Sequence, residues 1–320
     1  MDLYNLIKGL TFLLMTLLGI FGNAVIALYF LGILHQKQKL KTSDVILSNL
    51  PWTNLIMILT RGVPHSLLVF GIKNMFNDVS CKVITFAFRV SRAMSICLTC
   101  LLSCYQCATV ASSNPKWSYI KHKMQTFLLP TFIFLLILNS AVHIAGAINA
   151  LSGRNSSRLL YTFNMGYCIV VFPDQFSFQA NGYSIFTRDL VFVVLMTLAS
   201  IKILLILYYH GKRIRGIKNP EENPESTKES RASKMIVILV SLYVFFFGID
   251  STIWLYQTTV SSEVHIVITD IRFFFSICYG SFFPIVILTF NKKIRTALKY
   301  SASGSQQEEN DISYIKGHNE

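Results

Sequence analysis

Seven long apolar segments constrain what this chain can fold into. A helix that crosses the hydrocarbon core of a bilayer needs about 20 consecutive apolar residues, and each of these segments is long enough to supply them. They run over about 6–33, 44–70, 81–110, 124–148, 188–210, 234–257 and 264–290. Only 14% of the 320 residues are charged, against about 25% in a typical soluble domain. We therefore expect an all-α membrane protein in which residues 1–300 form one bundle of seven transmembrane helices.

The net charge of +13 is concentrated in alternate connections between these segments. Lysine and arginine gather after the first, third, fifth and seventh segments, within 37–41, 116–123, 212–234 and 292–299. Cytoplasmic loops carry such an excess of basic residues, so the pattern predicts an extracellular N-terminus and a cytoplasmic C-terminus. The same distribution favours contact with membrane lipid, and no nucleic-acid partner is expected.

Two polar stretches fit this orientation. The sequence "NSS" at Asn155–Ser157 is an N-glycosylation acceptor, and it falls in a connection predicted to be extracellular. Asn155 is therefore the expected glycan site. Residues 301–320 are polar, and we expect them to form a disordered cytoplasmic tail.

The seven cysteines divide by their predicted depth in the membrane. Cys81 begins the third segment and Cys168 lies between the fourth and fifth, so only these two fall on the oxidising side, and topology predicts a disulfide between them. Four others share one helical face: Cys97, Cys100, Cys104 and Cys107. That face could be a metal or redox site, but no histidine or carboxylate accompanies it in this helix, so packing against a neighbouring helix is favoured. No metal or other cofactor is expected.

Four arginines lie at comparable depth below the outer ends of three segments: Arg61, Arg89, Arg92 and Arg272. A charge at the membrane centre costs at least about 2.5–3.5 kcal/mol, so these side chains need partners. Asp250 and Asp270 are the acidic candidates, and together they leave a positive excess. One hypothesis is a cavity for an anionic or electron-rich ligand, because an arginine fork matches a carboxylate. The alternative is a structural role, in pairing or in snorkelling toward the interface, and we favour it for Arg61, beside Pro64.

The second and third segments carry the most specific sequence signal. The third reads "CKVITFAFRVSRAMSICLTCLLSCYQCATV" (81–110), and the second contains "LSNL" followed by "RGVP". Together with "KWSYIKHK" (116–123), these runs resemble the vomeronasal type-1 receptor family of G-protein-coupled receptors, which includes the fish class A-related olfactory receptors. The resemblance extends from Gly22–Asn23 to Ser281–Pro284. Tyr105 and Gln106 stand where rhodopsin-like receptors have Asp-Arg, so these two are the candidate switch on the G-protein side.

The resemblance implies a chemosensory receptor of the plasma membrane. Such a receptor would bind a small pheromone or odorant in an extracellular-side cavity and signal through a heterotrimeric G protein of the inhibitory class. A bitter-taste-like receptor is an alternative within the same fold. A transporter for small anions is a more remote one, because paired repeats with broken helices are not found. An enzyme is not expected, because the sequence offers no nucleophile–base pair or metal-ligand spacing.

Overall fold

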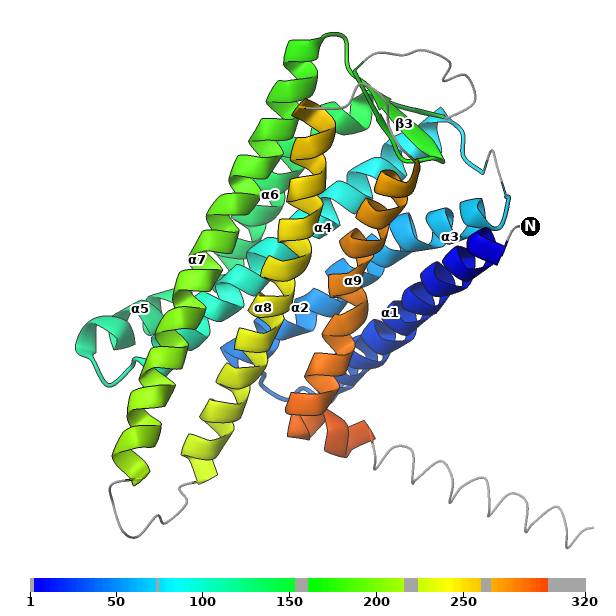
Figure 1. Ribbon diagram of the computed structural model, residues 1–320. Helices are drawn as coiled ribbons and strands as arrows, with labels where there is room; N and C mark the ends of the chain where they lie inside the picture. The colour runs from blue at the N-terminus through cyan, green and yellow to red at the C-terminus, as the bar shows by residue number, and fades with distance from the viewer. Residues whose placement is uncertain (1–2, 73–74, 153–160, 216–223, 260–265, 299–320) are drawn as a thin grey trace, which may run out of the picture.

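The computed structural model describes residues 3–72, 75–152, 161–215, 224–259 and 266–298, and the protein is mostly helical (Figure 1). The helices are α1 (Leu3–His35), α2 (Thr42–Met57), α3 (Val63–Val69), α4 (Asp78–Val110), α5 (Pro115–Thr126), α6 (Leu128–Ile148), α7 (Gln175–Arg215), α8 (Pro224–Thr259) and α9 (Ile266–Phe290). A π-helical turn, η1 (Ile58–Gly62), joins α2 to α3. Asn155 and the tail 301–320 lie outside the described residues.

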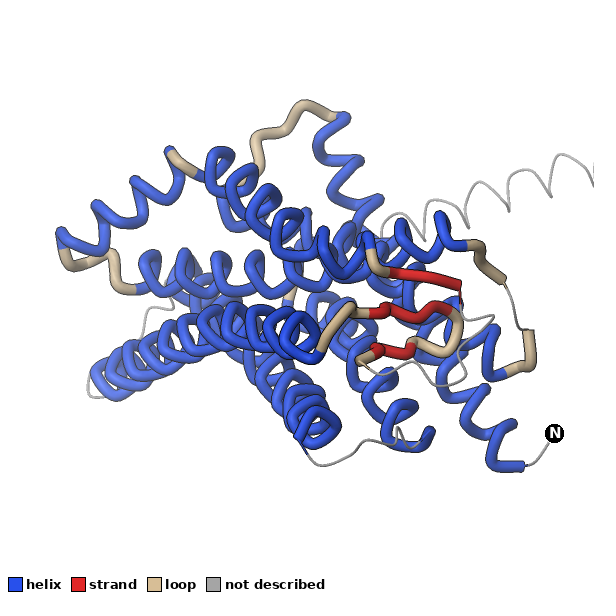
Figure 2. Tube along the Cα trace, turned by 90° about the horizontal axis from the view of Figure 1, so that it is seen from above, coloured by secondary structure: helices blue, strands red, loops and turns tan. Residues whose placement is uncertain are grey.

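A small antiparallel sheet covers one end of the helix bundle, which we call the sheet end (Figures 1 and 2). It contains β1 (Ala150–Ser152), β2 (Thr162–Asn164) and β3 (Cys168–Val171) in the order β1–β3–β2. Ala150 pairs with Val170 in one ladder, and Phe163 pairs with the same residue in the other. The N-terminal end of α1 lies toward the same end of the bundle.

α4 is the central helix of the bundle, and it packs against α2, α6, α7 and α8. Of its most apolar 18 residues, 78% are buried, compared with 17% for the equivalent window of α6. The outer helices instead expose large aliphatic side chains, such as Leu136 and Ile137 on α6 and Leu204 and Leu205 on α7. Apolar surface of this extent requires a lipid environment.

Six helices in the described part of the chain are long and apolar enough to cross a membrane, and they lie within α1, α4, α6, α7, α8 and α9. They correspond to six of the seven expected segments. The remaining segment, 44–70, is divided among α2, η1 and α3, which follow one another without a gap. The fold is therefore a multi-pass helical membrane bundle.

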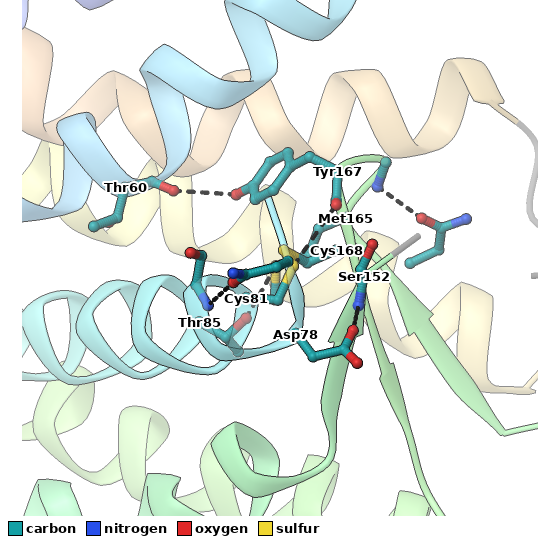
Figure 3. Close-up of a disulfide and its surroundings, with 12 residues drawn as sticks. Thr60, Asp78, Cys81, Thr85, Ser152, Met165, Tyr167 and Cys168 are labelled. Atoms are coloured by element: carbon teal, nitrogen blue, oxygen red, sulfur yellow. Dashed lines mark hydrogen bonds between the residues drawn. A yellow bond between two sulfur atoms is a disulfide. The ribbon is translucent and has the colours of Figure 1, made fainter. Parts of the chain in front are cut away.

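The π-helical turn follows from a proline one turn later. Pro64 has no N–H, so the carbonyl of Thr60 loses the partner that a regular helix would supply. The N–H of Val63 donates to the carbonyl of Ile58, five residues earlier, which makes the turn wider than an α-helical one. The hydroxyl of Tyr167 donates to the freed Thr60 carbonyl at 3.2 Å (Figure 3). Tyr167 belongs to the segment 150–171 that contains the three strands and that we call the cap. It thus satisfies a backbone group that the proline leaves unpaired.

The predicted disulfide between Cys81 and Cys168 is confirmed, and it fastens β3 to the first turns of α4 (Figure 3). Asp78 strengthens the same junction, because its Oδ1 accepts a hydrogen bond from the backbone N–H of Ser152 at 2.7 Å. Tyr167 is buried beside this junction, and burial raises its pKa to about 12. The sheet is therefore held in place over the helix ends.

A buried polar network connects α1, α2, α4 and α9 below the sheet end. The amide of Asn23 donates to the carbonyl oxygens of Gly19 and Gly280 at 2.7 and 2.8 Å. Asn54 donates to Asn23 Oδ1 at 3.3 Å, and the Ser95 hydroxyl donates to Asn54 Oδ1 at 3.1 Å. Polar side chains at this depth need such partners, so the network fixes the register of the four helices.

Candidate functional site

A cavity lies beneath the sheet, among α4, α7, α8 and α9. The volume in which the centre of a water-sized sphere fits is about 100 Å³. By the same measure, a single water molecule needs about 10–15 Å³. Its charged lining consists of Arg61, Arg89, Arg92, Arg188, Arg272, Asp189 and Asp250. Its apolar wall is mostly aromatic: Phe88, Phe163, Phe172, Phe178, Phe186 and Phe247. The structure thus brings Asp250 and all four of the sequence-predicted arginines to one cavity.

Asp250 on α8 bridges two of these arginines. Its Oδ2 accepts from Arg92 Nη2 of α4 at 2.7 Å, and its Oδ1 accepts from Arg272 Nε of α9 at 3.0 Å. The Asp250 side chain is 7% exposed, so this is a charge-assisted bridge with little solvent access. Three helices are held together at the level of the cavity.

Asp270 was the other acidic candidate for these arginines, but it pairs elsewhere. Its carboxylate lies 2.9 Å from Lys8 Nζ and 3.5 Å from His65 Nε2. Residues two apart on a helix do not face the same way, so Asp270 cannot follow Arg272 into the cavity. The ring of His65 in turn packs between Phe12 and Phe273.

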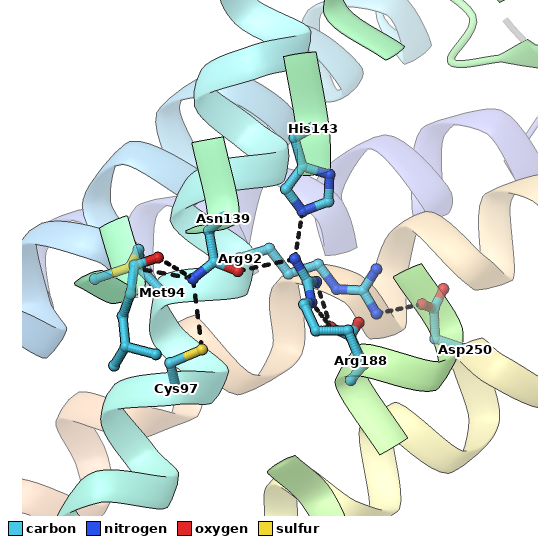
Figure 4. A network of polar contacts seen from close by, with 9 residues as sticks. Arg92, Met94, Cys97, Asn139, His143, Arg188 and Asp250 are labelled. Carbon is cyan, nitrogen blue, oxygen red and sulfur yellow. Dashed lines mark hydrogen bonds and ion pairs between the residues drawn. The ribbon is translucent and has the colours of Figure 1, made fainter. Parts of the chain in front are cut away.

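A second ion pair in the cavity was missed by sequence reasoning. Arg188 pairs with Asp189, and its Nη1 also contacts Asn139 Oδ1 at 2.9 Å and His143 Nε2 at 2.7 Å (Figure 4). Because arginine only donates, His143 Nε2 is the acceptor, and the ring is inferred to be neutral with its proton on Nδ1. Asn139 on α6 also donates to the Cys97 sulfur of α4 at 3.5 Å.

The position of Arg188 explains why it was missed. The apolar pattern placed the start of the fifth segment at residue 188, at the membrane surface. α7 begins instead at Gln175, which puts Arg188 about 20 Å along the helix at 1.5 Å per residue. The available signal was an adjacent arginine and aspartate at the edge of a long apolar run.

The other two arginines of the cavity have no carboxylate partner among the described residues. Arg89 Nη1 donates to the neutral amide of Asn181 at 3.3 Å. Arg61 lies with its guanidinium between the rings of Phe88 and Phe273, at 4.4 and 3.9 Å from their centroids. Five arginines and two aspartates leave an excess of three positive charges at the cavity.

The opposite end of α4 carries the candidate switch residues. Tyr105 is buried, and its hydroxyl accepts a hydrogen bond from Gln125 Nε2 of α5 at 3.0 Å. Gln106 is buried as well, with 7% of its surface exposed. Nearby, Lys202 Nζ of α7 lies 3.5 Å from the ring centroid of Trp117 on α5. In the described part of the chain, no three His, Cys, Asp or Glu side chains come together as a metal site requires.

Comparison with known proteins decides the family. The model of the vomeronasal organ pheromone receptor family matches residues 6–300. The chain belongs to this family. It is a family of receptors rather than enzymes, and membership implies a small-molecule ligand and coupling to a G protein in general. With its six apolar helices, the protein is a multi-pass membrane protein and a chemosensory receptor.

Individual relatives of this vomeronasal-family chain agree with the family match. "Olfactory receptor class A-like protein 1" of Danio rerio is 38% identical over 320 residues, which is the full length of both chains. "Vomeronasal type-1 receptor 3" of Homo sapiens is 28% identical over 74% of this chain and 77% of its own length. "Vomeronasal type-1 receptor 1" of Homo sapiens is 28% identical over 87% of this chain and 77% of its own length.

Proposed function

We propose that this vomeronasal-family receptor binds a small anionic pheromone or odorant in the cavity and activates a heterotrimeric G protein at the opposite end of the bundle. The observation that carries the proposal is the excess of three positive charges within an aromatic cavity. An anionic ligand would neutralise part of that excess. The phenylalanines would bury its apolar part, as in most small-molecule sites.

The proposal includes an orientation in the plasma membrane. The segment 44–70 crosses as the second span in chain order, which brings the total to seven. The N-terminus and the sheet lie outside, and the C-terminus lies in the cytoplasm. The basic residues within 37–41 and 116–123 support this, because they follow α1 and α4 at the end away from the sheet. The disulfide lies at the sheet end, where an oxidising environment would preserve it. Asn155 would carry a glycan on the same side.

We propose that the wall that meets the ligand is formed by four arginines and one aspartate: Arg61, Arg89, Arg92, Arg272 and Asp250. An anion bound in the cavity alters the electrostatic environment of Arg92 and Arg272, and both of these arginines donate to the Asp250 carboxylate. Ligand binding therefore changes the bridge between α4, α8 and α9. A change in that bridge is a physical route from the cavity to helix movement.

Tyr105 and Gln106 are proposed to govern coupling at the cytoplasmic end. Tyr105 joins α4 to α5 through Gln125, and the neutral side chain of Gln106 supplies no charge for an ionic lock. Loss of the contact between α4 and α5 would favour the active state. A G protein of the inhibitory class is the expected partner.

The test is expression in cells that contain a promiscuous G protein, with calcium as the readout. Panels of small organic acids, their primary amides, amines and steroids are applied. The proposal expects responses to acids that their amides do not reproduce. It also expects Arg92→Ala to abolish these responses at matched surface expression. Lys121→Ala on α5 is the control, and a receptor with this substitution is expected to keep the ligand selectivity of the wild type. Accumulation of an acid inside the cells without a calcium signal would instead indicate a transporter.

A further inference from the structure

We infer that Arg61 is the residue that receives the anionic group of the ligand, and that this group is a compact oxyanion such as a carboxylate or sulfonate. The inference rests on the proposed function, because both place an anion in the cavity. It goes further by assigning the anion to one arginine of the five. It also reverses the structural role that the sequence favoured for this residue.

The ion pairs divide the five arginines into two groups. Arg92 and Arg272 share Asp250, and Arg188 pairs with Asp189. Each of these cations is therefore already opposed by a carboxylate.

Arg61 and Arg89 have no carboxylate partner among the described residues. Arg89 is half-buried and has the amide of Asn181 as a partner. Arg61 is only 2% exposed and lines the cavity. A buried cation without a counter-charge is unfavourable, so Arg61 has the stronger demand for an anion.

The surroundings of Arg61 cover the two faces of its guanidinium plane but supply no hydrogen-bond acceptor to the Nε–H at its edge. Phe88 and Phe273 cover the guanidinium with their rings, at 4.4 and 3.9 Å from the centroids. Aromatic faces attract a cation, but they do not accept its in-plane N–H groups as an oxygen does. Its Nε is buried, and within the described residues it has no hydrogen-bond partner. An oxyanion lying in the plane of the guanidinium would accept two parallel N–H groups, which is the geometry that is missing.

The local backbone gives Arg61 this position. Arg61 lies in the π-helical turn, and the residue that such a turn inserts rotates the following side chains by about 100° relative to α2. Gly62 then allows close packing on α1, because a Cβ there would lie 2.9 Å from Thr16 Oγ1. Tyr167 fixes the turn from the other side through Thr60. Turns of this type are frequent at functional sites.

A distinct consequence follows for stability. If Arg61 serves the ligand rather than the fold, its charge destabilises the unliganded receptor, and replacing it with an apolar residue of similar length stabilises the protein. A structural arginine behaves in the opposite way. The sign of the change in melting temperature therefore separates the two roles.

The experiment uses the full-length receptor in nanodiscs of zwitterionic lipid. Melting temperature is followed with a thiol-reactive dye, which reports exposure of the five free cysteines, four of them buried. Acetate and methanesulfonate are the probes, each substituted for chloride at constant ionic strength, and acetamide is the neutral control. The variants are Arg61→Met, Arg61→Lys and the matched Arg89→Met.

We expect both anions, but not acetamide, to raise the melting temperature of the wild-type receptor. Arg61→Met is expected to raise it by about 2–4 °C without any anion, and to abolish the response to acetate. Arg61→Lys keeps the charge but loses the fork, so the acetate concentration for half-maximal effect rises roughly ten-fold. Arg89→Met removes another arginine of the cavity wall, so it is expected to weaken the response without abolishing it. The lysine variant preserves the test if the methionine variant does not fold.

Any of the following results would overturn the inference: a lower melting temperature for Arg61→Met, an acetate response that survives in both Arg61 variants, or loss of the response in Arg89→Met alone. An equal effect of acetate and acetamide would do the same. Ligand-independent nucleotide exchange, measured on a G protein added to the same nanodiscs, reports the proposed function separately. A receptor that couples but responds to acetate without Arg61 contradicts this inference and leaves the proposed function standing.

Discussion

Replacement of Asp250 by asparagine tests whether the bridge between Arg92 and Arg272 holds the bundle together. The substitution keeps the shape of the side chain and removes its charge, so two arginine charges then face a neutral amide. The Asp250 side chain is 7% exposed, and those of Arg92 and Arg272 are 21% and 11% exposed. The charges are therefore poorly solvated, and they depend on the carboxylate.

The magnitude follows from this burial. Removing one partner of a buried ion pair costs about 3–5 kcal/mol, and the partial exposure of Arg92 favours the lower end, about 3 kcal/mol. For a chain of 320 residues, that loss corresponds to a fall of about 4–5 °C in melting temperature. Asp44→Asn is the matched control, because its partner Lys293 lies 3.9 Å away with a side chain that is 66% exposed. Such a surface pair contributes at most about 1 kcal/mol.

The assay is thermal unfolding of the purified receptor, completed as a double-mutant cycle with Arg92→Met. The change caused by Asp250→Asn is expected to be smaller when Arg92 is already absent, with a coupling of about 1–3 kcal/mol. A melting temperature for Asp250→Asn equal to that of the Asp44 control would refute the reasoning. Additive effects of the two substitutions would refute it as well, because they would show that the two side chains stabilise the bundle independently.

Three further predictions concern the cap and the cavity wall. Tyr167→Phe leaves the Thr60 carbonyl without its donor and is expected to cost about 1–3 kcal/mol in thermal unfolding. The raised pKa of Tyr167, about 12 against 10.0 unfolded, makes its contribution complete below pH 10 and lost as pH rises toward 12. Gly146→Ala places a Cβ against Arg89 Nη1, so the guanidinium must move. Ligand potency is expected to fall in the calcium assay while the melting temperature stays nearly unchanged, because the displaced group is the end of a flexible side chain. Cys168→Ser is expected to cost about 2–4 kcal/mol and to lower surface expression.

Each of these changes has a matched control in the same chain. Tyr161→Phe alters a more exposed tyrosine near the sheet, and a pH profile in which both tyrosine variants lose the same contribution would contradict the assignment to Tyr167. Gly32→Ala adds a Cβ to open space, so an equal loss of potency there would show that Arg89 is not the cause. Cys104→Ser removes a free thiol, and an equal loss of expression would mean that the disulfide is not what stabilises the cap.

The cavity shows how far helix depth can be predicted from the sequence. Counting 1.5 Å per residue from the outer ends placed Arg61, Arg89, Arg92 and Arg272 at one level, and all four line the cavity. Depth is predictable because the bilayer fixes where an apolar helix begins and ends. The count failed for Arg188, because α7 continues beyond the apolar run that marks its span.

Helix rotation and local backbone irregularity were not predictable in the same way. Asp270 and Arg272 have similar depth but face different neighbours, because side chains two positions apart on a helix point about 200° apart. Asp270 consequently contacts Lys8 and His65, and Asp250 alone bridges the arginines. A proline beside Arg61 indicated a kink, but not the π-helical turn that brings its guanidinium between two rings.

The sequence by itself determined three features of this protein. The apolar helices follow from hydropathy, and the disulfide between Cys81 and Cys168 follows from topology. The resemblance to the vomeronasal receptors follows from stretches, such as 81–110, that match the pattern of that family. Only the tertiary structure decided which arginine has a carboxylate and which does not. Pairing depends on side-chain direction, and direction is set by how α4, α8 and α9 pack rather than by their order in the chain. That difference assigns Arg92 to the bridge with Asp250 and leaves Arg61 to meet an anion.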